Sequence, residues 1–104
     1  YGTVKDPAQF RALHAYSPYH RVQDGTAYPP ALLMVGANDV TVAPWHSRKM
    51  IARLQAASSS TAPLLLVTTF DAGHGAGNSI DQEVGSQTDA ASFMLHALGV
   101  PLAQ

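Results

Sequence analysis

The chain has 104 residues, with 46% hydrophobic residues, 12% charged residues and a formal net charge of −1. The near-neutral charge argues against nucleic acid or an anionic membrane as a partner. Because the chain has no cysteine, disulfide and zinc–thiolate frameworks are excluded, whereas the compartment stays open between cytoplasm and periplasm. The charged share is about half the usual level, so we expect much of the surface to contact further protein.

The first predicted element is a helix that begins at residues 6–7, where an acidic N-cap precedes a proline. Gln9 is placed to close a capping box with Asp6. Phe10 and Leu13 are expected to face the core, and the Ser-Pro pair at 17–18 ends the helix. Residues 17–30, which contain three prolines, are predicted to form a loop.

Two apolar runs follow, ALLMVGA at 31–37 and PLLLVTTF at 63–70. Neither alternates with polar residues, which is typical of strands buried on both faces. Between them, a helix is predicted to start at Pro44. Its core face repeats at helical spacing through Ser47, Met50, Ile51, Leu54 and Ala57.

The last predicted helix begins near Ser79, with Gln82 placed for a second capping box, and ends at residues 99–101. One apolar face repeats at intervals of four and three through Val84, Thr88, Ala91, Leu95 and Leu98.

The resulting order is α-β-α-β-α, and two buried strands joined by a helix predict a parallel pair. A parallel pair needs further strands beside it. We therefore expect residues 1–104 to be the C-terminal part of a larger α/β domain, with Tyr1 as a cut point within a longer protein.

Polar residues follow both predicted strands, Asp39 after the first and His74 after the second, 35 residues apart. The carboxyl ends of adjacent parallel strands gather active residues, so these side chains are expected within hydrogen-bond reach. A carboxylate that accepts a ring N–H fixes the tautomer of a general-base histidine. The alternatives are a turn or cap role for Asp39 and a backbone-bonded loop role for His74.

Three glycines surround the histidine, at 73, 75 and 77, and are expected to allow positive φ. A phosphate-binding loop fits poorly, because Asn78 stands where a dinucleotide fingerprint needs its last glycine and no lysine follows.

Other candidates have weaker support. Asp71 is the second choice for the acid, Trp45 is expected in the core, and His46 is expected to pack or form a hydrogen bond. The histidine spacing argues against a metal, and no cofactor is expected. No serine lies in a G-x-S-x-G elbow, so a nucleophile is expected upstream, and Ser79 is interpreted as a helix cap.

Several motifs together resemble the prolyl oligopeptidases, serine peptidases with an α/β-hydrolase domain beneath a β-propeller. They are YG at 1–2, YSP at 16–18, His20, YP at 28–29, Asp39, P-x-HS at 44–47 and AGHGAG at 72–77. The resemblance covers nearly the whole chain and implies the C-terminal portion of an α/β-hydrolase fold. It also implies that Asp39 and His74 are the catalytic acid and base.

The same resemblance implies that Tyr1 and Val42 line the pocket for a substrate proline. One position departs from the family, because Thr41 stands where an arginine usually binds a substrate carbonyl. The expected function is part of a serine peptidase that cleaves after proline in short peptides, inactive by itself, with the remaining parent polypeptide as partner. The alternatives are an acylaminoacyl- or dipeptidyl-peptidase-like hydrolase or esterase, and an inert fragment that self-associates through a strand edge.

Overall fold

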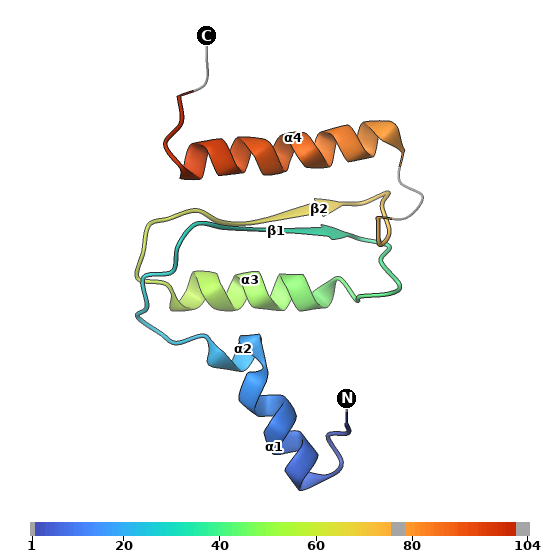
Figure 1. Ribbon diagram of the computed structural model, residues 1–104, viewed down its shortest axis with the longest axis vertical. Helices are drawn as coiled ribbons and strands as arrows, with labels where there is room; N and C mark the ends of the chain where they lie inside the picture. The colour runs from blue at the N-terminus through green and yellow to red at the C-terminus, as the bar shows by residue number, and fades with distance from the viewer. Residues whose placement is uncertain (1, 76–78, 102–104) are drawn as a thin grey trace.

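The computed structural model describes residues 2–75 and 79–101 (Figure 1). Its elements, in chain order, are α1 (Pro7–Tyr16), α2 (Pro18–Arg21), β1 (Ala31–Gly36), α3 (Trp45–Ala57), β2 (Leu64–Thr69) and α4 (Ile80–Ala97). The α-β-α-β-α order is confirmed, with one addition: the short helix α2 lies inside the predicted loop 17–30. Pro18 occupies its first position, where proline removes no helical hydrogen bond.

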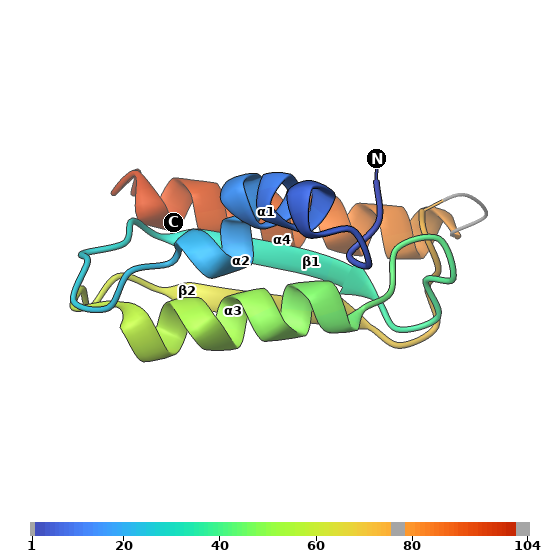
Figure 2. The same cartoon turned by 90° about the horizontal axis from the view of Figure 1, so that it is seen from below.

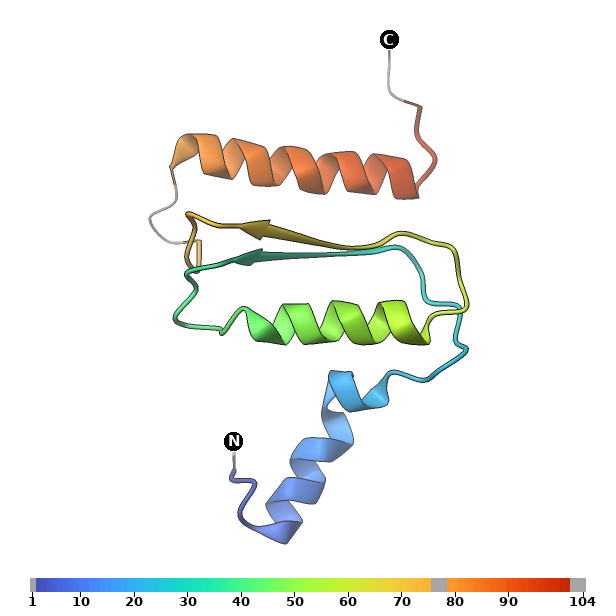
Figure 3. The same ribbon diagram turned by 180° about the vertical axis from the view of Figure 1, so that it is seen from behind.

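The two strands pair in parallel, in a register that runs from Ala31 opposite Leu64 to Gly36 opposite Thr69. Helix α3 forms the crossover between them, as the βαβ prediction requires. Figures 1 and 3 show α3 and α4 on opposite sides of the strand pair. The described chain therefore forms three layers, and both strands end at the same edge, near the start of α4.

The core lies between α3 and the strand pair. Its buried members are Val22, Ile51, Leu54, Ala57 and Leu64. The three from α3 belong to the apolar face predicted from the helical repeat, so that face is confirmed. The strands themselves are less buried than predicted, because Met34 and Leu65 are exposed.

Helix α4 begins as predicted, with a complete capping box. Ser79 Oγ accepts from the Gln82 backbone N–H, and Gln82 Oε1 accepts from the Ser79 backbone N–H. Its predicted apolar face is only partly used, since Val84 and Leu98 are exposed. Phe93 instead lines a hollow against the strands. Residues two apart on a helix point in nearly opposite directions. With Phe93 turned toward the strands, the predicted apolar face of α4 therefore points largely away from them.

Helix α1 corrects two predictions. Gln9 closes no capping box with Asp6, because its Oε1 accepts from the Thr3 backbone N–H at 2.8 Å. Asp6 caps the helix alone, accepting from Ala8 and Gln9. Phe10, expected in the core, is exposed. The reason is position, since α1 lies at the end of the molecule furthest from α4 and to one side of α3 (Figures 1 and 2).

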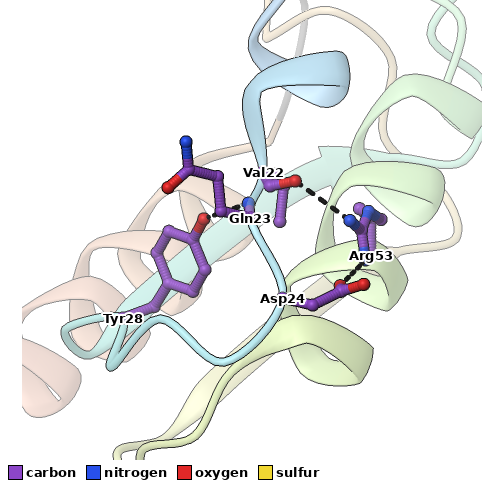
Figure 4. Close-up of polar contacts among 5 residues, drawn as sticks. All are labelled: Val22, Gln23, Asp24, Tyr28 and Arg53. Carbon is purple, nitrogen blue, oxygen red and sulfur yellow. Dashed lines mark hydrogen bonds and ion pairs between the residues drawn. The ribbon is translucent and has the colours of Figure 1, made fainter.

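Arg53 of α3 fastens the chain that follows α2 (Figure 4). Its guanidinium donates to the Val22 carbonyl at 2.9 Å and forms an ion pair with Asp24. Nearby, the Gln23 backbone N–H donates to the Tyr28 hydroxyl at 2.7 Å. These contacts hold the path from α2 toward β1 without regular secondary structure.

The molecule has more surface than a compact chain of its size. Its accessible area is 7523 Å², whereas a folded monomer of this mass exposes about 5,600 Å². Its radius of gyration is 16.6 Å, against about 13 Å for a compact domain of 100 residues. Among the described residues, no helix is both long and apolar enough to cross a membrane.

Candidate active site

Asp39 lies three residues beyond the end of β1, and both of its carboxylate oxygens have partners. Oδ1 accepts from the backbone N–H groups of Thr41 at 2.9 Å and Val42 at 2.8 Å. This contact builds the turn toward α3, as an aspartate at the start of a turn commonly does. The turn role considered for Asp39 is therefore present, and it occupies only one oxygen.

The other oxygen faces the loop after β2. Asp39 Oδ2 lies 2.7 Å from His74 Nδ1, which is the contact that the 35-residue spacing predicts. The Asp39 side chain is only 9% exposed, whereas that of His74 is 54% exposed. The acid is thus shielded, and the imidazole stays accessible to another group.

The backbone N–H of Val42, followed by the contact with His74, lowers the pKa of Asp39 below its ordinary value of 3.8. Asp39 is therefore ionised at neutral pH and can only accept hydrogen bonds. His74 must then carry its proton on Nδ1 and donate it to Oδ2. In the neutral imidazole, this leaves Nε2 as the proton acceptor.

The glycines around His74 have different roles. Gly75 has a φ of +94°, with open space where a Cβ would stand, so its conformation favours glycine. Gly73 does not have a positive φ, which corrects the expectation for that position. Gly77 lies outside the described residues.

Asp39 and His74 line a groove of about 430 Å³ at the edge where the strands end. Val42 lines the same groove and is exposed, whereas Tyr1 lies outside the described residues. Further lining residues come from β1, α3 and α4, namely Met34, Ser47 and Ser86. Ser47 belongs to the P-x-HS motif at 44–47, whereas no sequence motif marks Met34 or Ser86.

Three other candidates lie apart from this contact. The Asp71 backbone carbonyl accepts from Gln82, and the carboxylate bound to His74 is that of Asp39. Trp45, expected in the core, is 52% exposed, because it lies about two and a half helical turns before the buried Leu54 and so on the opposite face of α3. Its ring stacks on His46 at 3.8 Å between centroids, which gives His46 the packing role expected for it. Within residues 2–75 and 79–101, no cluster of three acidic or histidine side chains offers a metal site.

Comparison with known proteins identifies the family. The model of the prolyl oligopeptidase family matches residues 1–101. A prolyl endopeptidase of Elizabethkingia meningoseptica is 41% identical over 101 residues, which cover 96% of this chain and 14% of that protein. The chain thus spans about one seventh of the length of such relatives.

Solved structures agree. A structure from a study of two prolyl endopeptidases matches with a TM-score of 0.90 and 39% identity, over 97% of this chain and 15% of the other. Prolyl oligopeptidase B from Galerina marginata matches with a TM-score of 0.86 and 33% identity, over 99% of this chain and 15% of that one. The described elements are therefore part of an α/β-hydrolase fold. Since the family model covers nearly the whole sequence, this chain belongs to the prolyl oligopeptidase family.

Proposed function

We propose that this chain supplies the catalytic acid and base of a serine peptidase that cleaves peptide bonds after proline in short peptides. The observation that carries the proposal is the 2.7 Å contact between Asp39 Oδ2 and His74 Nδ1 at the carboxyl ends of two adjacent parallel strands. Relatives named prolyl endopeptidases support the reaction and the substrate class.

The mechanism follows from the proton positions. A serine elsewhere in the parent polypeptide attacks the substrate carbonyl, and its hydroxyl proton moves to His74 Nε2. Asp39 stabilises the imidazolium that forms. His74 then gives the proton to the leaving amine as the C–N bond breaks, and a water activated by the same nitrogen hydrolyses the acyl-enzyme. By itself, the chain is expected to be inactive because it lacks the nucleophile.

Substrate contacts are assigned to Tyr1 and Val42. Val42 is supported by its place on the groove beside Asp39, where an exposed branched side chain suits a flat apolar ring. Its position is also fixed, because its backbone N–H is bonded to the catalytic acid.

Replacement of His74 in the full-length parent tests the role of the base. We expect His74→Ala to lower kcat by about 10⁴-fold or more with a proline amide substrate, because no other group then takes the serine proton. His96→Ala is the matched control, since this exposed histidine lies in the last turn of α4 and does not line the groove. Full activity of His74→Ala would refute the assignment.

One observation favours a second candidate function, an acylaminoacyl- or dipeptidyl-peptidase-like hydrolase or an esterase. Thr41, where an arginine is expected from the family resemblance, is exposed beside Asp39. Loss of a charge-assisted hydrogen bond there is worth about 1.5–3 kcal/mol of substrate binding. A comparison of kcat/KM for proline amides, acylaminoacyl peptides and simple esters separates the candidates.

A further inference from the structure

Gly36, the last residue of β1, lies against the backbone that leads to His74. A Cβ at position 36 would stand 2.2 Å from the Gly73 carbonyl oxygen and 2.5 Å from that of Ala72. The φ of Gly36 is not positive, so conformation alone does not require glycine. What requires glycine is space, because any side chain would overlap the backbone of the histidine loop.

The next residues bind the same loop through hydrogen bonds. The Ala37 backbone N–H donates to the Thr69 carbonyl at 2.9 Å, which extends the strand pairing beyond β1. The Asn38 backbone N–H donates to the Ala72 carbonyl at 3.0 Å, and Asn38 Nδ2 donates to the Phe70 carbonyl at 2.9 Å.

We infer that Gly36 and Asn38 are positioning residues for the acid–base pair. They fix residues 69–73 against the end of β1, and the pair follows immediately, since Asp39 adjoins Asn38 and His74 adjoins Gly73. The contact between Asp39 and His74 therefore depends on how closely the two backbones approach. This inference rests on the proposed function of the pair.

The expected size of the effect follows from the overlap. Ordinary contact of a Cβ begins at 3.4 Å, so Gly36→Ala must push the Ala72–Gly73 backbone away by about 1 Å. A displacement of that size in a reacting group costs about 10²-fold in rate. Asn38→Ala removes only the bond to Phe70 and leaves the backbone bond to Ala72, so its effect is smaller, about five- to tenfold.

The test uses the full-length parent with three variants: Gly36→Ala, Asn38→Ala and Gly85→Ala. Gly85 lies within α4, where the described residues leave open space for a methyl group, so its substitution is the matched control. We expect kcat to fall about 10²-fold in Gly36→Ala with little change in KM. We also expect the strongly deshielded proton resonance of the His74 Nδ1–H bond to weaken or disappear, an effect that a purely structural role would not produce.

The outcomes are distinct. If Gly36→Ala does not fold, the kcat of Asn38→Ala and the same proton resonance in that variant test the positioning role. Wild-type kcat and an unchanged resonance in folded Asn38→Ala and Gly36→Ala would overturn the positioning role alone. If the resonance is missing in the wild type and His74→Ala keeps its activity, both the proposed function and the positioning role are refuted.

Discussion

At the scale of single residues, Asp39 combines two tasks that sequence reasoning treats as alternatives. Oδ1 forms the turn through Thr41 and Val42, while Oδ2 accepts from His74. The turn bonds hold the carboxylate in place, so the imidazole meets a fixed acceptor. In the proposed reaction, a pre-positioned acceptor of this kind orients His74 as the base with little reorganisation.

The lowered pKa of Asp39 predicts a specific pH dependence. A carboxylate whose pKa is lower in the folded state adds stability above its ordinary pKa and loses this contribution as pH falls through the folded value. We expect the Asp39 carboxyl resonance to titrate with a midpoint below 3.8.

A midpoint for Asp39 at or above 3.8 would contradict the bonding that the structure shows.

At the scale of elements, Arg53 holds the segment between α2 and β1 by two unequal contacts. Its own side chain is 29% exposed, whereas that of Asp24 is 78% exposed. An ion pair this exposed is screened by water and contributes little. The bond to the Val22 carbonyl lies in a partly buried setting, and its loss leaves that acceptor without its partner.

We therefore expect Arg53→Ala to loosen residues 22–28 more than Asp24→Ala does. In the full-length parent, amide hydrogen exchange of this segment should rise about fivefold in Arg53→Ala, equivalent to about 1 kcal/mol of local stability. Asp24→Ala should change it little. Equal effects of the two variants would mean that the ion pair carries the attachment.

At the scale of the whole molecule, surface area and shape indicate that the described part needs additional protein around it. Apolar side chains such as Val40, Val84 and Leu98 are exposed, and within the described residues each strand pairs along one edge only. An unpaired strand edge and uncovered apolar surface both favour association with another chain.

For the isolated 104-residue chain, we expect self-association. Sedimentation velocity at increasing concentration should show dimers or larger species, and Val84→Lys should reduce them, because a charge on the exposed face of α4 opposes apolar contact. A monomer at every concentration would contradict this prediction.

Much of the local structure follows from the sequence because its causes are local. The Ser79–Gln82 capping box and the apolar face of α3 depend on residues three or four positions apart. The contact between Asp39 and His74 also follows, since two parallel strands bring their carboxyl ends together. Gln9 shows the limit of such reasoning. The capping motif predicts that its side-chain oxygen accepts from the helix N-terminus, but this oxygen accepts from the Thr3 backbone N–H instead.

The sequence by itself determined the order of elements apart from the short helix α2, the parallel strand pair and the residues at the end of each strand, because periodicity, capping and strand geometry act over short distances. Only the tertiary structure decided which faces of α1 and α4 are covered. Trp45 and Phe10 are exposed although they are apolar, because burial depends on which other elements pack against a residue and not on its own type. The need for glycine at position 36 has the same origin, since the atoms that exclude a side chain there belong to Ala72 and Gly73, more than thirty residues away.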